Sequence, residues 1–199
     1  MPSSNLVRWG AIGAMLAGVA WIASVVVNLA ITSPQGPTAF SLSSPLDEAT
    51  YIVALAGMLV GLAGLHARQT RSYGRLGVTG FLVAFMGSAL ALLGLVLSLS
   101  ARGEVFEREL LDQVLGLGLL AMLLGLVLLG LGFIVLGIAT LRAGVLPRWC
   151  GVALILALPV SVALGNYGGR ILLGVVWLAL GYVLWAKRGE AAQRSRRAT

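Results

Sequence analysis

The chain has 199 residues, 59% of them hydrophobic and only 11% charged, and its mean hydropathy is +0.98. A soluble domain has roughly 45–50% apolar and about 25% charged residues, so this composition excludes an ordinary soluble fold and makes the lipid bilayer the expected partner. The net charge of +7 does not form a basic stripe with interleaved aromatic residues, which argues against nucleic acid as a partner.

Apolar stretches long enough to cross a membrane divide the chain. A helix needs about 20 residues to span about 30 Å of hydrocarbon. Six stretches approach or exceed this length, at about residues 9–31, 45–66, 76–100, 114–141, 149–165 and 171–186. The sequence therefore predicts an all-α integral membrane protein. It is expected to be a bundle of six transmembrane helices in a single domain, residues 1–187, followed by a basic cytoplasmic tail, residues 188–199.

The first and fifth stretches differ from the others. The first has an apolar run longer than the ~7–15 residues of a signal peptide, so we expect it to be a retained helix. The fifth is short and contains Pro159, which removes a backbone donor and predicts a kink.

Cationic residues predict the orientation, because cytoplasmic loops are enriched in Lys and Arg. With the amino terminus inside, the outer segments hold only three of the 14 Lys and Arg residues, namely Arg102, Arg108 and Arg170. Both termini are therefore expected in the cytoplasm. Arg170 is expected in an outer loop, where its replacement should change little.

The segment before the second span has the pattern of a helix start. Ser44 is placed to cap the helix, Pro45 suits its first position, and the carboxylates of Asp47 and Glu48 face the positive end of the helix dipole. We expect ordinary capping here. An acid/base pair or a cation site at Asp47 and Glu48 is the alternative.

Small residues recur along several spans at helical spacing, and such rows let helices pack closely. Packing within the molecule is the expected role, and a lipid groove or a sliding interface is the alternative. The seven-residue rows are Gly118, Gly125, Gly132, Ala139 and Gly174, Gly181; the four-residue rows are Gly57, Gly61, then Gly80, Ala84, Ser88, then Ala153, Ala157, Ser161, Gly165.

The charged stretch "GEVFERELLDQ" precedes the fourth span. Glu104, Arg108 and Asp112 follow one another at i, i+4 spacing and predict a salt-linked helix face. Phe106 and Leu110 lie on another side. The stretch is expected to extend the fourth helix, or to lie along the membrane surface as a docking site.

Helix entrances of similar composition recur along the chain. In "LRAGVLPRWCG", residues 141–151, Pro147 suits a first helical turn, Arg148 holds the loop inside and Trp149 suits the headgroup boundary. "VRWGAIG" and "GRLGVTG" open the first and third spans in a similar way. Three helical hairpins are one arrangement that fits. Whether they are true duplicates stays open, because orientation alone places arginine at these corners.

This stretch also resembles the L-R-x-G-x-x-P-R-W-x-G loop of small, uncharacterised multi-spanning membrane proteins of actinobacteria and related bacteria. The resemblance covers about eleven residues and the hydropathy profile. It implies a multi-pass protein of the bacterial plasma membrane. It carries no activity, substrate or site residue with it.

No catalytic, cofactor-binding or metal-binding set is evident. No Asp, Glu, Lys or Arg lies in the central half of any predicted span, which argues against a carboxylate-coupled pump. His66 is expected at the membrane boundary, and Cys150 is expected to act as a small apolar residue. Neither belongs to a nucleophile or metal motif.

A few polar and aromatic residues fall within the spans. Interhelical hydrogen bonding is the expected role of the polar ones, which are Ser24, Asn28, Ser88 and Ser161. Trp21 and Trp177 lie away from the expected membrane boundaries and predict buried packing. The alternative is that they line a pocket for a lipid or another hydrophobic ligand.

These observations favour a non-enzymatic accessory or regulatory membrane protein that acts through association with a membrane-protein partner or with a second copy of itself. The alternative is a small transporter or channel for a neutral or lipidic solute. No cofactor is expected. Molecular activity, ligand, partner and oligomeric state cannot be read from the sequence.

Overall fold

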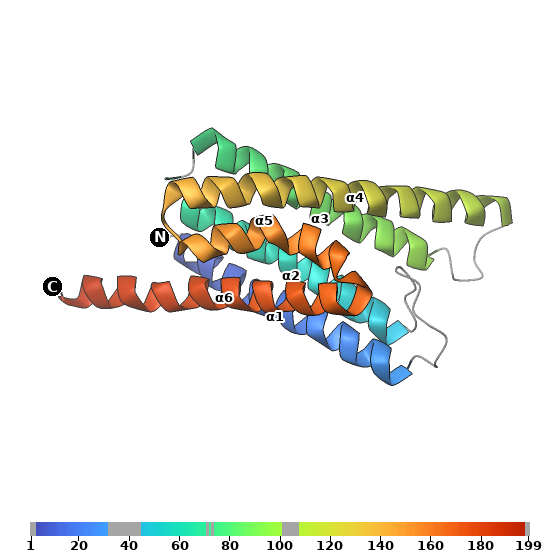
Figure 1. Ribbon diagram of the computed structural model, residues 1–199, viewed down its shortest axis with the longest axis horizontal. Helices are drawn as coiled ribbons and strands as arrows, with labels where there is room; N and C mark the ends of the chain where they lie inside the picture. The colour runs from blue at the N-terminus through green and yellow to red at the C-terminus, as the bar shows by residue number, and fades with distance from the viewer. Residues whose placement is uncertain (1–2, 32–44, 71, 73, 101–107, 198–199) are drawn as a thin grey trace.

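The computed structural model describes residues 3–31, 45–70, 72, 74–100 and 108–197, and every regular element in these ranges is helical (Figure 1). The helices are α1 (Ser3–Ile31), α2 (Pro45–Gln69), α3 (Gly74–Ser100), α4 (Arg108–Ala143), α5 (Arg148–Ala163) and α6 (Gly165–Arg197). Within the described part of the chain, five helices are long and apolar enough to cross a membrane. The chain is therefore an all-α, multi-pass membrane protein, as its composition predicts.

The fifth helix is the exception. α5 has 16 residues, which corresponds to a rise of about 24 Å, less than the thickness of a hydrocarbon core. It continues through Pro159, and only Leu164 separates it from α6. Gly165 allows this tight reversal because its φ of +70° is open to glycine at little cost.

Charged stretches next to two of the predicted spans are helical. α4 begins at Arg108, so Leu110 and Asp112 belong to an extension of the fourth helix, whereas Glu104 and Phe106 lie outside the described residues. α6 runs to Arg197, so the predicted basic tail continues the sixth helix. The charged residues thus extend α4 at its start and α6 at its end, and each forms one continuous helix with its apolar span.

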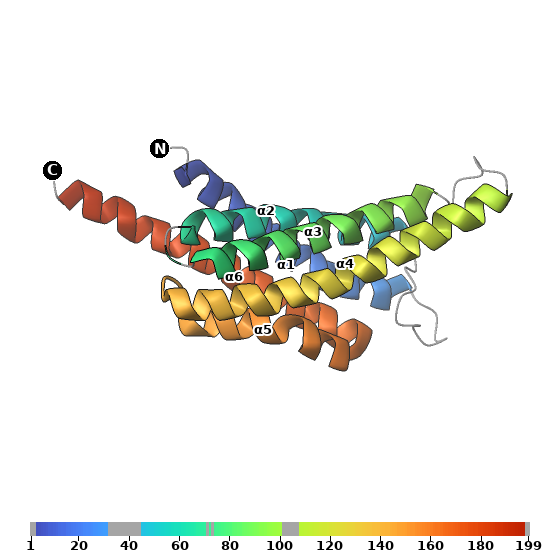
Figure 2. The same cartoon turned by 90° about the horizontal axis from the view of Figure 1, so that it is seen from above.

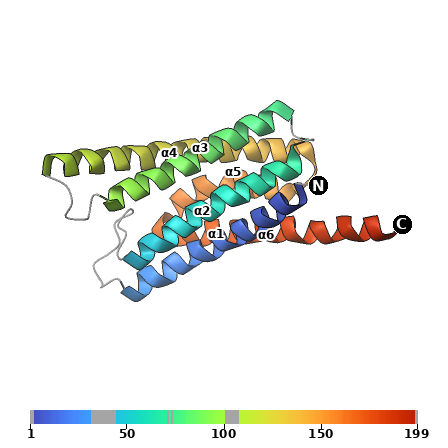
Figure 3. The ribbon, with the colours of Figure 1, turned by 180° about the vertical axis from the view of Figure 1, so that it is seen from behind.

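The helices run up and down, with both ends of the chain at one end of the bundle (Figures 1 and 2). We name this the terminal end and the opposite one the far end. α1 packs along α2, and α3 packs along α4, but α6 packs more extensively on α1 than on α5. The molecule thus consists of an α1/α2/α6 group and an α3/α4 group, with α5 between α4 and α6, rather than three equivalent hairpins. The two groups diverge towards the far end (Figure 3).

Glycine contacts hold the α3/α4 group together. A Cβ atom on Gly125 would lie 2.5 Å from the Ala91 backbone nitrogen and 2.8 Å from the Gly87 carbonyl oxygen, distances at which something must shift. The seven-residue row of α4 meets a second seven-residue row in α3, which consists of Gly80, Gly87 and Gly94. The predicted role of the α4 row in packing within the molecule is confirmed.

The α1/α2/α6 group uses the same device. Cβ atoms on Gly18 and Gly181 would lie 2.6 Å from the Gly174 carbonyl oxygen and 2.9 Å from the Ala11 carbonyl oxygen, respectively, so α1 and α6 are in close contact. Gly57 contacts α1 in a similar way. Within the described helices, the predicted glycine rows are therefore largely used to join neighbouring helices of one chain.

The core lies where the two groups meet. Trp177 of α6 is fully buried, and its ring packs against that of Phe133 in α4, with 5.9 Å between the ring centroids. Leu62, Leu154 and Leu180 are buried with them. The default prediction for Trp177, buried packing, is confirmed.

Candidate functional site

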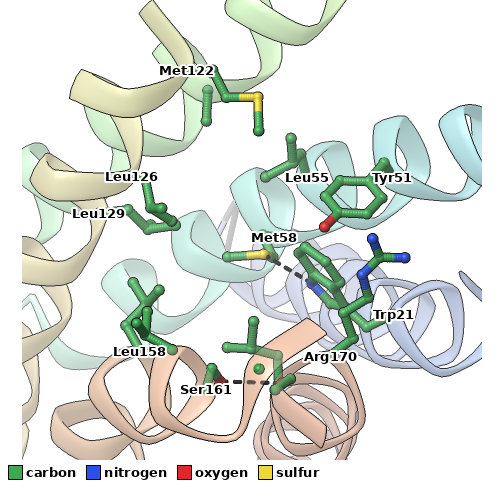
Figure 4. Close-up of a pocket in the computed structure, with 15 residues that line it drawn as sticks. Trp21, Tyr51, Leu55, Met58, Met122, Leu126, Leu129, Leu158, Ser161 and Arg170 are labelled. Carbon is green, nitrogen blue, oxygen red and sulfur yellow. Dashed lines mark hydrogen bonds between the residues drawn. The ribbon is translucent and has the colours of Figure 1, made fainter. Parts of the chain in front are cut away.

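A cavity lies where the short fifth helix ends. α5 runs antiparallel to α4 but is less than half its length, so a large part of α4 extends past the α5–α6 turn (Figure 1). Between the two helix groups at this level the structure has a cavity of about 220 Å³. All six helices line it, with Trp21, Tyr51, Ala91, Met122, Leu158 and Arg170 as one representative from each (Figure 4).

The cavity wall is mainly apolar. Most of its side chains are leucine, methionine and small residues, and Ser161 directs its hydroxyl to carbonyl oxygens, those of Ala157 and, at 3.1 Å, Gly169. The Trp21 indole donates to the Met58 sulfur at 3.3 Å (Figure 4). The Trp21 indole and the Ser161 hydroxyl are thus occupied by the protein itself.

The cavity is open on one side. Val162 and Gly165, which line it at the α5–α6 turn, are exposed, and Met122 is half-buried. Met58, which also lines the cavity, is almost fully buried. A molecule can therefore reach the cavity past the α5–α6 turn.

A buried ion pair forms one wall. The Arg170 Nη1 atom lies 3.1 Å from the Asp47 Oδ1 atom, and the two side chains are only 4% and 0% exposed. The Asn28 amide donates to the other Asp47 oxygen, Oδ2, at 3.1 Å. The Arg170 guanidinium also lies over the Tyr51 ring, 4.6 Å from its centroid, at a cation–π distance. This polar cluster, Asn28, Asp47, Tyr51 and Arg170, joins α1, α2 and α6.

The fold explains why both charges are buried. Because α5 is short, the chain reverses at Leu164 and Gly165, and Arg170 lies in the first turns of α6 against α1 and α2. The prediction that Arg170 lies in a loop between the fifth and sixth spans is therefore wrong, because it lies within α6. Asp47 lies in the first turn of α2 as predicted, and its carboxylate forms this buried ion pair in addition; Ser44, the predicted cap, lies outside the described residues.

One donor of the cluster has no partner. The Arg170 Nε atom is buried and has no hydrogen-bond partner among the described residues. Buried N–H groups are almost always hydrogen-bonded, so one without a protein partner is a place where a water or a bound molecule can supply the acceptor. Arg170 itself lines the cavity (Figure 4). The polar cluster can thus offer one more hydrogen bond to a molecule in the cavity.

Of the other residues singled out from the sequence, Ser161 lines the cavity and Asn28 belongs to the polar cluster. Trp21 is buried, as predicted, and also lines the cavity, which fits the pocket alternative considered for it. His66 is half-buried and stacks on Phe81, with 4.1 Å between ring centroids. Cys150 is buried. No group of three His, Cys, Asp or Glu side chains suited to a metal ion occurs among the described residues, Asp47 and Glu48 included.

Two polar residues that the sequence analysis passed over lie at the terminal end. The Thr140 hydroxyl of α4 donates to the Gln69 side-chain oxygen of α2 at 3.1 Å, and both residues are buried. Nearby, Arg68 Nη1 donates to the Leu184 carbonyl oxygen of α6 at 3.3 Å. Thr140 could have been found from the sequence, because it is a hydroxyl residue within the apolar run of α4.

No protein-family model, curated protein or solved structure matches this chain. The cavity and the polar cluster on its wall are therefore the features from which its function is inferred.

Proposed function

We propose that this membrane protein is a non-enzymatic carrier or receptor that binds one lipidic, or otherwise apolar, solute in the cavity. The observation that carries the proposal is an apolar cavity that is open past the α5–α6 turn and has one polar wall. Ligand sites in proteins typically combine such apolar lining with a few convergent polar groups, and they often lie between the helices of bundles.

The size of the cavity fits part of such a molecule. An engineered apolar cavity of about 150 Å³ holds benzene, so one of about 220 Å³ accommodates a ring or the upper part of an acyl chain. The remainder of a lipid would extend through the open side, past Val162. This supports a ligand that is bound partly inside the protein and partly in the bilayer.

The chemistry of the wall supports binding rather than reaction. The lining residues include no His, Cys, Asp or Glu. Ser161 directs its hydroxyl to backbone carbonyls and has no general base beside it within the lining. We therefore assign the cavity no catalytic step.

Association with a partner stays a prediction, but the glycine rows that motivated it give it little support, because they join helices of the same chain. α4 does expose several leucines on its other side, among them Leu120 and Leu124. Such a face is what a helix presents to lipid.

Filling the cavity tests the proposal. Leu126 lines the cavity and is half-buried, so Leu126→Trp should occupy it, whereas Leu124→Trp makes the same change on the exposed side of α4. The protein is purified from native membranes in mild detergent, and bound lipid is measured by native mass spectrometry. We expect the wild type and Leu124→Trp to retain one bound species, and Leu126→Trp to lose it.

Retention of the same species by Leu126→Trp would reject the cavity as the binding site. Absence of any bound species from the wild type, together with failure of added apolar molecules to restore one, would reject the proposed function.

We also propose that the protein resides in a bacterial cell membrane with its terminal end in the cytoplasm, on the basis of its arginine distribution. Ser72 lies at the terminal end and Asp112 at the far end, and both are exposed. In a Cys150→Ala background, an impermeant thiol reagent should label Asp112→Cys in intact cells but not Ser72→Cys. External labelling of Ser72→Cys would reverse the orientation.

A further inference from the structure

The polar cluster has a charge balance that restricts the ligand. Asp47 supplies one negative charge and Arg170 one positive charge, at 3.1 Å and buried. Because the pair is neutral as a whole, an added anion would share one guanidinium with Asp47, and an added cation would share one carboxylate with Arg170. In a buried site neither would be compensated, and uncompensated buried charge is costly.

The carboxylate is also held in position. Its Oδ1 atom accepts from Arg170 and its Oδ2 atom accepts from Asn28, so contacts from two helices fix its orientation. Asp47 therefore cannot move aside to admit a second anion without losing both contacts. An anion at the Nε edge of the guanidinium would share the single positive charge of Arg170 with Asp47, which stays bound at Nη1.

What the cluster does offer the cavity is a buried donor without a partner among the described residues. The Arg170 Nε–H group is buried at the cavity wall and has no partner among the described residues. One N–H group with a delocalised positive charge matches one uncharged oxygen acceptor. The apolar lining around it matches hydrocarbon attached to that acceptor.

We infer that the ligand is an uncharged lipid whose ester or ketone carbonyl accepts a hydrogen bond from Arg170 Nε, and that the Asp47–Arg170 pair excludes anionic lipids. This inference rests on the proposed function and names the class of molecule that the same cavity takes. Its most direct occupant is a neutral glycerolipid with the ester carbonyl at Arg170 and the chain along the leucines and methionines (Figure 4).

Three probes with identical hydrocarbon chains separate the contribution of the ester carbonyl from that of the headgroup charge. They are a diacylglycerol, its dialkyl ether analogue without carbonyls, and the corresponding phosphatidic acid. Each competes against a diazirine-bearing diacylglycerol for photo-crosslinking to the purified wild-type protein in nanodiscs. We expect the diacylglycerol to compete at about tenfold lower concentration than either of the others, the ratio expected from the lower end of the range for a hydrogen bond to a charged group.

A variant changes the charge balance in a defined way. Asp47→Asn keeps an acceptor for Arg170 but removes the negative charge. The concentration of phosphatidic acid needed for competition, relative to that of diacylglycerol, should therefore fall by about tenfold or more. Glu48→Gln removes the same charge from the neighbouring residue, which does not line the cavity, and should leave the wild-type order unchanged. The wild-type comparison stands by itself if Asp47→Asn does not fold.

The outcomes distinguish this inference from the proposed function. No saturable crosslinking, or crosslinking that none of the three probes reduces, overturns the proposed function and the inference with it. Equal competition by all three probes, or strongest competition by phosphatidic acid or by the ether analogue, leaves cavity binding intact and overturns the inference about the carbonyl and the ion pair.

Discussion

The two ends of the bundle use buried polar side chains in different ways. At the terminal end the Thr140–Gln69 hydrogen bond joins α4 to α2, and thus connects the α3/α4 group to the α1/α2/α6 group. At the far end the described contacts of Asp47 with Asn28 and Arg170 join α2 to α1 and α6, which are members of one group. The groups lie together at the first end and diverge at the second (Figure 3).

The cavity lies at the end of the bundle where the described polar contacts do not join the two helix groups. Between helices in a membrane, apolar contact alone gives little preference over contact with lipid, so close packing and polar contacts decide which helices stay together. Where a polar contact joins the two groups, the bundle is closed. Where the polar contacts lie within one group, glycine contacts hold α3 and α4 to each other, and the cavity opens beside them.

Breaking the far-end pair should have the largest effect. Asp47→Ala leaves the buried Arg170 charge without its carboxylate, and such single removals cost about 3–5 kcal/mol of unfolding free energy. Arg170→Ala should be similar, and the double variant should cost less than the sum of the two. Unfolding in detergent, followed by circular dichroism across the double-mutant cycle, measures this coupling.

Glu48→Ala is the control for this pair, since it removes the neighbouring, half-buried carboxylate. If Asp47→Ala and Arg170→Ala cost no more than Glu48→Ala, the pair does not hold the α1/α2/α6 group together.

Overpacking the glycine contact tests how the α3/α4 group is held. Gly125→Leu places four carbons where the Ala91 nitrogen and the Gly87 oxygen already lie, and overpacking of this kind costs about 1–3 kcal/mol. Leu124→Met changes an exposed side chain on the same helix and should be neutral. A detergent melting temperature for Gly125→Leu equal to that of the wild type would mean that α3 and α4 are not in close contact there.

The terminal-end contact should have the smallest effect on stability. Thr140→Val removes the donor to Gln69, and interhelical hydrogen bonds in membrane proteins average about 0.6 kcal/mol. Its local effect is sharper: amide hydrogen exchange in the last turn of α2 should become faster as the two groups separate. Thr79→Val removes an exposed hydroxyl that bonds only within α3, and equal exchange in the two variants would disprove the role of Thr140.

The helices could be predicted from the sequence because their cause is local. Each apolar stretch satisfies its backbone groups within one helix, and each of the six predicted spans coincides with a helix. The α4 row at Gly118, Gly125 and Gly132 was also visible. Its partner in α3, with the same seven-residue spacing, was equally readable, but the four-residue row that begins at Gly80 obscured it.

The polar cluster could not be predicted in the same way. Asp47 and Arg170 are 123 residues apart, and each has a sufficient local explanation, one as a helix-start carboxylate and the other as a loop cation. Their pairing depends on the packing of α6 against α1 and on the length of α5. Those are properties of the assembled bundle, which no single stretch of sequence contains.

The pairing of an early residue with a late one has a consequence for biosynthesis. Asp47 leaves the ribosome 123 residues before Arg170, which at about 5–20 residues per second is an interval of roughly 6–25 s. During that interval the α1–α2 hairpin reaches the membrane without the guanidinium that later neutralises its carboxylate. The ion pair of this hairpin is therefore completed only when α6 has been made. A nascent chain that stops before Arg170 retains the Asp47 carboxylate without the guanidinium that pairs with it in the finished bundle.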